Sequence, residues 1–369
     1  MASRAEHQLD ALVVGAGAIG LACAWRAAQA GLRVRVLERD VPGAGASGVA
    51  AGMLAPVGEA TWGEDRLIDL ALRSHERWPR FAEELTAASG TQVGYLRQGA
   101  LHVALDPDEA AELRRRFELM REMGLEAEWL RTSQARELEP GLTPRCAAAL
   151  IAPHEAAADP RMLVEALRLA CEHARVELET GAEVTEGIYD DDRLAGVRTA
   201  DGGEHRARAT VLAAGAWSGQ ANWLPPEARP PVRPVKGEIL TLRAPGPPPC
   251  QRVVVTERVY MVPRGDGRLV IGATVEEKGF DTAITAGGVL ELLREGYRAL
   301  PDVAELELVE TIAGLRPGTP DNMPIIGAGA IEGLVLATGH FRNGILLAPL
   351  TADLVVAALA ADREEALAR

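Results

Sequence analysis

The chain has 369 residues, of which 47% are hydrophobic and 25% charged, a composition that excludes a disordered or fibrous protein. Its formal net charge of −14 argues against nucleic acid as a partner, because phosphate binding depends on an excess of Lys and Arg on one face. A chain of this length exceeds the size at which a single core keeps growing, so we expect two lobes.

The N-terminal ten residues are polar and lack the basic flank and apolar stretch of a signal peptide. We see no run of about 20 apolar residues anywhere in the chain, which is the length that a membrane-spanning helix needs. The sequence therefore predicts a cytoplasmic protein that makes no contact with a membrane.

Gly15, Gly17 and Gly20 follow a short apolar run that begins at Leu12, and an alanine-rich helical stretch comes after them. Glycines at this spacing let the chain turn tightly and let its backbone approach a pyrophosphate at the N-terminus of the helix. Glu38 ends the next alternating run, where its carboxylate would accept from ribose hydroxyls and would repel a phosphate. The pattern predicts a βαβ unit that binds NAD or FAD rather than NADP. Its predicted contacts are Gly15, Gly17, Ala18, Ile19, Gly20, Glu38 and Arg39.

Residues 41–53 form a loop of small residues that cannot build a core by itself. Such a loop can lie flat against a ligand, and its Ala and Met content differs from that of a polar flexible linker. An NAD-binding unit would continue into another regular strand and helix here, so the loop favours FAD. The predicted cofactor contacts are Ala46, Ser47, Ala50, Ala51, Gly52 and Met53.

The rest of the chain alternates between helical and strand-like segments. Helical spacing of apolar residues predicts a helix from Asp65 to Ser89 that Gly90 closes. Asp159 and Pro160, as capping carboxylate and first-turn proline, open another helix. The proline-rich block 225–234 marks a crossing into the second lobe. The other predicted elements are strands at 100–105, 129, 176–178, 194–198, 205–208, 209–217, 239–242, 252–255, 260–263, 269–273 and 334–339, and helices at 106–124, 289–300 and 344–360.

This order of elements predicts an α/β fold (α+β overall) in which a Rossmann-like FAD-binding lobe is joined to a second, mostly antiparallel substrate lobe. Each lobe is discontinuous in sequence. The predicted FAD-binding domain comprises residues 1–90, 145–225 and 308–369, and the predicted substrate-binding domain comprises residues 91–144 and 226–307.

Cys23, Cys146, Cys171 and Cys250 are scattered along the chain without the paired spacing of metal ligands. Zinc sites in proteins of this kind are built from closely spaced pairs of Cys or His. We therefore predict reduced thiols and no metal.

Three further motifs, at 213–218, 314–317 and 339–345, complete a resemblance over nearly the whole length to the D-amino-acid oxidase family of flavoproteins, most of all to its glycine oxidases of thiamine biosynthesis. The resemblance implies non-covalent FAD and oxidation of an amino acid to an imine, with O2 reduced to hydrogen peroxide. Some relatives attach the flavin through a C-terminal cysteine, and this chain has none after Cys250. Further FAD contacts implied by the resemblance are Val184, Ala214, Gly215, Trp217, His340, Arg342, Asn343, Gly344 and Ile345.

Arg316 is the candidate for binding the carboxylate of the substrate, because a guanidinium makes two parallel N–H···O bonds in a fixed plane. It lies in what we interpret as a rigid turn, and the family carries its carboxylate-binding arginine in a matching motif. Tyr260 stands on an alternating strand where the family has an active-site tyrosine, so its hydroxyl could donate to the same carboxylate. Arg258, on the same strand face, would line the mouth of the pocket.

Arg342 is the third predicted catalytic residue. It belongs to the loop 340–344 before the last helix, whose N–H groups the resemblance places near the pyrimidine ring of the flavin. His340 could act as a base, although a histidine that positions the loop is the plainer interpretation. Lys236 is expected to face water.

The substrate and the electron acceptor stay open. Glycine follows from the resemblance, with sarcosine, D-alanine and D-proline as alternatives. Rival interpretations are a dehydrogenase that reduces a membrane quinone, a flavoprotein module that modifies the wobble uridine of tRNA, and an inactive flavin-binding subunit. The absence of a basic amphipathic helix argues against the dehydrogenase, and the acidic charge argues against the tRNA-modifying module. The pair Arg316 and Tyr260 argues against the inactive subunit. The expected partners are the small amino acid, O2, further copies of the chain in a homo-oligomer, and a transient contact with a thiazole synthase.

Overall fold

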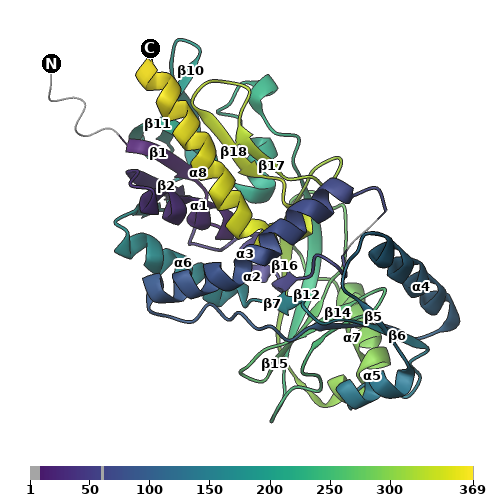
Figure 1. The fold of residues 1–369 in the computed structure, drawn as a ribbon. Coiled ribbons are helices and arrows are strands. Elements are labelled where there is room, and N and C mark those ends of the chain that lie inside the picture. Colours follow the sequence, from purple (N-terminus) through teal and green to yellow (C-terminus); the bar gives the residue numbers. More distant parts are fainter. Residues whose placement is uncertain (1–8, 60–61, 369) are drawn as a thin grey trace.

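The computed structural model describes residues 9–59 and 62–368 (Figure 1). This part of the chain contains two eight-stranded sheets and one two-stranded sheet. The expectation that the N-terminus carries no signal peptide falls mostly on residues 1–8, which lie outside the described residues.

The first sheet carries the predicted βαβ unit at its centre. β1 is hydrogen-bonded in parallel to β2 on one side and to β11 on the other, and its last four residues are buried, as expected for a strand covered on both faces. The strand order is β17-β18-β11-β1-β2-β8, with β10 and β9 extending from β11. The strands are β1 (Leu9–Val14), β2 (Val34–Glu38), β8 (Glu177–Thr180), β9 (Val184–Asp190), β10 (Arg193–Thr199), β11 (Glu204–Leu212), β17 (Ile325–Ala328) and β18 (Leu334–Thr338).

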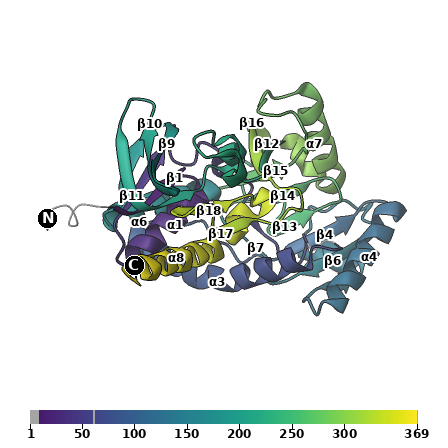
Figure 2. The ribbon, with the colours of Figure 1, turned by 90° about the horizontal axis from the view of Figure 1, so that it is seen from above.

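Four helices pack together against this sheet: α1 (Ala18–Gln29), α3 (Asp65–Ser89), α6 (Pro160–His173) and α8 (Gly344–Ala368). Figure 2 shows α3 and α8 side by side. Trp25 of α1 and Phe81 of α3 meet edge to face with their ring centroids 5.5 Å apart, and both are buried. Such aromatic pairs contribute about 1 kcal/mol beyond the area that they bury.

The ends of these helices lie where the sequence predicts them. α3 continues through Pro79 and is closed by Gly90, whose φ of 74° gives the left-handed cap that glycine favours. α6 is capped by Asp159, whose side chain accepts from the backbone N–H groups of Arg161 and Met162.

The expectation that no long apolar run exists was wrong. Phe341–Ala361 is long and apolar enough to cross a membrane by length and composition. However, 56% of its apolar window is buried, and α8 contacts α1, α3, β17 and β18. A helix enclosed by neighbours on most sides is apolar nearly all round, so a core helix passes the same test.

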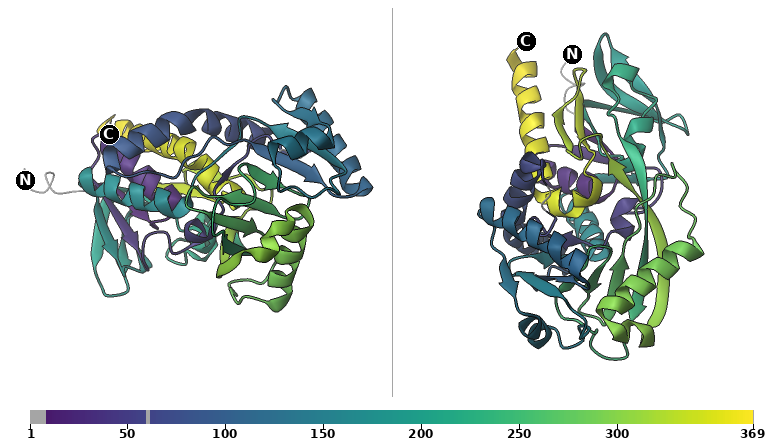
Figure 3. Two further views of the ribbon diagram at one scale, coloured as in Figure 1. Left: turned by 90° about the horizontal axis from the view of Figure 1, so that it is seen from below. Right: turned by 90° about the vertical axis from the view of Figure 1, so that its right-hand side faces the viewer.

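The second sheet is antiparallel except where β4 meets β13. Its strand order is β16-β12-β15-β14-β13-β4-β6-β5. The helix α7 (Ala286–Ala299) packs on β12 and β15, while α4 (Pro107–Glu122) and α5 (Thr132–Leu138) pack near β6. Figure 3 shows α4 and α7 at the end of the molecule opposite the C-terminal end of α8. The strands are β4 (Ala100–Ala104), β5 (Glu128–Leu130), β6 (Ala148–Ala152), β12 (Arg233–Arg243), β13 (Val253–Val255), β14 (Tyr260–Pro263), β15 (Arg268–Gly272) and β16 (Glu307–Gly318).

The remaining short elements connect the larger ones, and η4 packs against α7. β3 and β7 pair with each other in the two-stranded sheet. The bounds are α2 (Ala46–Val49), β3 (Met53–Leu54), β7 (Ala156–Ala157), and the 3-10 helices η2 (Gly215–Gln220), η3 (Pro226–Ala228), η4 (Pro301–Glu305) and η5 (Phe341–Asn343).

Two predictions about local structure were wrong. The segment 205–217 is not two strands but the single strand β11 followed by η2, because the chain turns at Gly215, whose φ is 54°. The predicted rigid turn around Arg316 is part of β16, which pairs with β12 along its length. Pro317 made a strand look improbable in the sequence, because proline is tolerated in a sheet chiefly at its edge. β16 is such an edge strand.

The predicted α/β fold with a Rossmann-like sheet and a second, mostly antiparallel sheet is confirmed. Two strands of the second sheet nevertheless fall in ranges that were predicted for the FAD-binding domain. β6 and β16 are hydrogen-bonded in the second sheet, although the predicted FAD-binding domain includes residues 145–225 and 308–369. The division into two domains stays a prediction.

Candidate functional site

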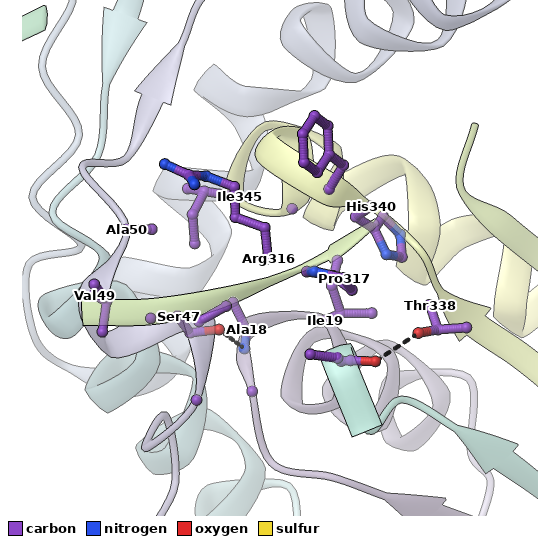
Figure 4. Close-up of a pocket in the computed structure, with 18 of the residues that line it drawn as sticks. Ala18, Ile19, Ser47, Val49, Ala50, Arg316, Pro317, Thr338, His340 and Ile345 are labelled. Carbon is purple, nitrogen blue, oxygen red and sulfur yellow. Dashed lines mark hydrogen bonds between the residues drawn. The ribbon is translucent and has the colours of Figure 1, made fainter. Parts of the chain in front are cut away.

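A cavity of about 710 Å³ lies between the two large sheets, where the ends of β1, β2 and β11 face β12, β14 and β16. Figure 4 shows Ala18 and Arg316, which come from opposite sides, in the same cavity. Among the predicted site residues only Gly20 and Asn343 do not line it. Those that do are Gly15, Gly17, Ala18, Ile19, Glu38, Arg39, Ala46, Ser47, Ala50, Ala51, Gly52, Met53, Val184, Ala214, Gly215, Trp217, Tyr260, Arg316, His340, Arg342, Gly344 and Ile345.

The glycine turn between β1 and α1 fits a phosphate group. Gly15 has a φ of 108°, and a Cβ at Gly20 would lie 1.9 Å from the Gly15 carbonyl oxygen, so only glycine allows this close packing. Gly17 caps α1 without a side chain, and Ala18 N donates to Ser47 Oγ at 3.0 Å. Because Gly17 provides no capping side chain, the positive end of α1 faces the cavity, where its N–H groups beyond Ala18 can meet an anion.

Glu38 holds the far end of this turn. Its Oε2 accepts from Ala16 N at 2.7 Å and its Oε1 accepts from Asp40 N at 3.0 Å. A carboxylate accepts about four hydrogen bonds, so two positions stay available on the cavity side. This is the place that the sequence predicts for a ribose-binding acid.

The small-residue loop is fixed against the cavity rather than free. Arg264 of the second sheet donates to the carbonyl oxygen of Ala51 at 2.5 Å and to that of Ala158 at 3.4 Å. The Arg264 side chain is 5% exposed and lies 3.8 Å from Asp159 Oδ2. Burial alone would raise the pKa of Asp159, but Arg264 and Arg268 together hold it below its usual value. Sequence reasoning missed Arg264.

Arg316 projects from β16 into the end of the cavity that the second sheet forms. Its Nη1 donates to the carbonyl oxygens of Thr274 at 3.1 Å and Lys236 at 3.3 Å. In the described part of the chain it forms no ion pair with a carboxylate. A cation held by carbonyl groups and half-buried in a cavity is a suitable partner for an anionic ligand.

Two glycines make room for Arg316 and Tyr260. A Cβ at Gly237 would lie 2.3 Å from Arg316 Nη1, and a Cβ at Gly272 would lie 2.4 Å from the Tyr260 hydroxyl. Burial raises the pKa of Tyr260, and Arg316 opposes that shift. The tyrosine therefore keeps its proton and can donate it to a ligand bound by the guanidinium. Gly272, a glycine within the predicted strand 269–273, was a signal for this site that sequence reasoning left unused.

Arg342 is ion-paired. Its Nε lies 3.1 Å from Glu59 Oε2 and its Nη2 lies 3.5 Å from Glu64 Oε2. Burial raises the pKa of Glu59, while Arg342 lowers it. Glu59 lines the cavity and was not among the predicted residues, although it comes shortly after the small-residue loop 41–53 in the sequence.

His340 and Lys236 are both buried. His340 Nε2 lies 2.9 Å from Thr351 Oγ1, and burial lowers its pKa to about 3, so it is neutral and suited to positioning the loop rather than to accepting a proton. The expectation that Lys236 faces water was wrong, because its side chain is fully buried and Nζ donates to Glu238 Oε1 at 2.8 Å. Alternation along β12 turns Lys236 and Glu238 toward the start of α7, where Glu238 also accepts from Thr285.

The remaining polar and metal-binding residue types do not form a metal site in the described part of the chain. The Arg39 guanidinium stacks on Trp217, 4.2 Å from its ring centroid. Arg258 lines the cavity and has an exposed side chain. All four cysteines are buried and free. Over residues 9–59 and 62–368 no group of three or more His, Cys, Asp or Glu is placed to hold a metal ion.

Comparison with known proteins gives a consistent result. A family model described as FAD dependent oxidoreductase matches residues 10–358. The glycine oxidase of Geobacillus kaustophilus is 36% identical over 366 residues, which cover 98% of this chain and 95% of that protein. The crystal structure of glycine oxidase from Geobacillus kaustophilus matches with a TM-score of 0.89 at 35% identity, covering 96% of this chain and 95% of that one. A Synechocystis protein named bifunctional protein ThiO/ThiG is 36% identical over 352 residues, which cover 94% of this chain and 51% of that protein.

Proposed function

The chain belongs to the family of FAD-dependent oxidoreductases, and we propose that it oxidises glycine, or another small amino acid with a free or singly substituted amine, to the imine. The enzyme class, an FAD-dependent amino-acid oxidase, is the one that the sequence predicts. The finer proposal is that O2 is the acceptor, that hydrogen peroxide is the second product, and that the 2-oxo acid forms when the imine meets water.

The cavity fits FAD by its own geometry. The turn at Gly15 and Gly17, with the open N-terminus of α1, would hold the pyrophosphate, and Glu38 would accept from the ribose of the adenosine half. The loop that Arg264 fixes at Ala51 presents small residues along the remaining length. When bound, FAD supplies a hydride acceptor that later passes its electrons on.

The observation that carries the proposal is the guanidinium of Arg316. It lies half-buried in the cavity without a carboxylate partner in the described residues, beside the Tyr260 hydroxyl. An α-carboxylate can take two parallel bonds from Arg316 and one from Tyr260, which orients the Cα–H bond of the ligand. Fixing a reactant in this way lowers the entropic part of the barrier, so the chain need not provide an acid and a base side by side.

The test is a panel of glycine, sarcosine, D-alanine and D-proline with FAD-loaded protein, followed by peroxide detection and an oxygen electrode. We expect glycine to give the highest kcat/KM and one peroxide for each O2 consumed. Bleaching of the flavin by glycine without O2 uptake would point to a dehydrogenase instead. Failure of every small amino acid to bleach the flavin would overturn the proposal.

We propose further that the imine serves thiazole formation in thiamine biosynthesis, with a transient contact between this chain and a thiazole synthase. The Synechocystis relative named bifunctional protein ThiO/ThiG supports this, because the present chain matches about half of a protein that combines two parts. Co-purification of the chain with the thiazole synthase of the same organism, and transfer of label from glycine to the thiazole in their mixture, would test it. If free labelled imine, added in place of glycine, gives the same transfer of label to the thiazole, direct delivery between the two proteins is contradicted.

A further inference from the structure

A buried polar pair lies behind the cavity and has no part in the function proposed above. Glu155 Oε2 and His102 Nε2 are 3.6 Å apart, and both side chains are 2% exposed. In the described structure neither ring nitrogen of His102 nor Glu155 Oε2 has a hydrogen-bond partner. Native proteins rarely leave buried polar atoms unsatisfied, so three of them in one place indicate a bridging water, a mobile proton or both.

A smaller cavity of about 210 Å³ begins at the His102 side of this pair. His102 lines it together with charged residues of the α4 region, Glu109, Glu112 and Arg116. Residues 255–257 line both this side cavity and the larger cavity, so a single turn separates the two spaces. The unpartnered imidazole of His102 therefore faces a polar space next to the site where the amino acid would bind.

Gly58 and Glu59 connect the pair to the larger cavity. Glu155 Oε1 accepts from the backbone N–H of Gly58 at 2.5 Å, and a Cβ at Gly58 would lie 2.3 Å from His102 Nε2. The next residue, Glu59, lines the larger cavity. The charged groups that act on Glu59 are Arg342, Glu155, Arg116 and Arg316, and His75 is a further titratable group that acts on Glu155.

The reaction needs a route for one proton. An amino acid in neutral water carries a protonated amine, whereas hydride can leave Cα only when the nitrogen lone pair is free. Arg316 cannot accept that proton, and Tyr260 keeps its own. Glu59 lines the same cavity and lies near enough to Glu155 and Arg316 for both of them to act on its carboxyl group.

We propose that Glu59 takes the ammonium proton of the bound amino acid and that Glu155 and His102 carry it to the side cavity. This inference rests on the proposed function. The N–H bond breaks with its electron pair left on the amine, and the proton adds to a carboxylate oxygen of Glu59. It then passes to Glu155, to Nε2 of His102, and from Nδ1 of His102 to water in the side cavity, so that the substrate loses one positive charge and the solvent gains it.

The first test follows anaerobic flavin bleaching by glycine from about pH 6 to about pH 10 in the FAD-loaded enzyme. Glu59→Gln, Glu155→Gln and His102→Gln should each slow bleaching at neutral pH by about a hundredfold or more, which is the typical contribution of general base catalysis. Each should recover the wild-type rate above the pKa of the free amine, because the substrate then arrives without the extra proton. The matched control is His154→Gln, which removes an exposed histidine next to Glu155 in the sequence and should keep the wild-type profile.

The second test measures binding without turnover. 2-Aminoisobutyrate has an amine but no hydrogen on Cα, and acetate has no amine, so neither can be oxidised. We expect Glu59→Gln to weaken binding of 2-aminoisobutyrate about tenfold at neutral pH and to leave acetate binding unchanged, as read from the flavin absorbance. Because the Glu59 side chain is 28% exposed, this variant carries the test even where Glu155→Gln or His102→Gln does not fold.

The outcomes separate the two proposals. If no amino acid bleaches the flavin of the wild-type enzyme, the proposed function is contradicted. In another outcome, glycine bleaches the flavin of the wild type while the variants keep the wild-type pH profile or lose the same factor in rate at every pH. That result contradicts only the proton route. An equal loss of acetate and 2-aminoisobutyrate binding in Glu59→Gln also overturns it.

Discussion

The Arg316 guanidinium lies against the backbone of Gly237 on the neighbouring strand, where an added Cβ would approach Nη1 to 2.3 Å. Gly237 is paired with Gly314 and Arg316 with Val235, so the guanidinium reaches back across the sheet over a position that carries no side chain. The carbonyl oxygens of Lys236 and Thr274 then fix its plane. The orientation of the proposed anion-binding group thus depends on the absence of a Cβ at Gly237 as much as on the arginine itself.

Arg316→Ala should raise KM for the amino acid by about ten- to a hundredfold, because a hydrogen bond to a charged group contributes about 1.5–3 kcal/mol and each 1.4 kcal/mol is a factor of ten. kcat should also fall, since the ligand is then less well oriented. Steady-state kinetics measure both values. Arg316→Lys keeps the charge but loses the planar fork and should give an intermediate KM. Unchanged kinetics in Arg316→Ala would remove this residue from the site.

Gly237→Ala should raise KM without weakening FAD binding, because the new methyl group forces the guanidinium out of its plane while the glycine turn at α1 is untouched. We expect an increase of about tenfold, the equivalent of one charge-assisted hydrogen bond. The matched control is Gly265→Ala in the same sheet region, where a Cβ meets nothing within 4 Å. Equal KM values for the two variants would show that the guanidinium can move at no cost.

The N-terminal half of the cofactor site could be predicted because its signal is local. The turn at Gly15, the acid at Glu38 and the small loop before Met53 are read from spacing and side-chain size alone, and all of them line one cavity. The C-terminal boundary of the second lobe, near β16, could not be predicted in the same way. β16 carries Pro317 and pairs with a strand about 75 residues earlier, so its strand character comes from pairing that the local sequence does not show.

The buried charges were also beyond sequence reasoning. Lys236 reads as a surface residue because lysines are almost never fully buried without a partner. Its partners Glu238 and Glu276 become evident only when alternation along β12 and the packing of α7 are known. The same applies to Glu59, Glu155 and His102, which come together from three separate segments.

Gly20→Ala should weaken FAD binding by at least about tenfold, because its Cβ would lie 1.9 Å from the Gly15 carbonyl oxygen and would push the glycine turn away from α1. Fluorescence titration of the apoprotein with FAD measures the Kd. Gly287→Ala in α7, where a Cβ has no neighbour within 4 Å, is the control and should bind FAD as the wild type does. Equal Kd values would contradict a tight glycine turn.

The buried, neutral His340 should make the protein less stable in mild acid. Its folded pKa of about 3 lies below the usual value of 6.5, so the unfolded state binds the proton more readily and the stabilisation present at pH 7 is lost as the pH falls from 6.5 toward 3. The slope within that window is at most about 1.4 kcal/mol per pH unit. His340→Gln, which cannot titrate, should show a flatter dependence of the denaturation midpoint between about pH 6.5 and pH 4.5. Parallel curves for the variant and the wild type would contradict a buried neutral imidazole.

Lys236→Met should destabilise the protein by about 3–5 kcal/mol, because it leaves the carboxylate of Glu238 buried without its cation. The chain offers a close control, since Lys278 is its one other lysine and pairs with the same Glu276 at 3.2 Å, yet its side chain is 48% exposed. Lys278→Met should therefore change the free energy of unfolding by less than about 1 kcal/mol. Urea unfolding of both variants measures the difference, and the double variant Lys236→Met with Glu238→Gln should recover part of the loss because it also removes the stranded charge. If the two single lysine variants unfold at the same urea concentration, the buried cluster contributes no more than a surface pair, and the fixed positions of the Lys236 carbonyl and of Arg316 need another explanation.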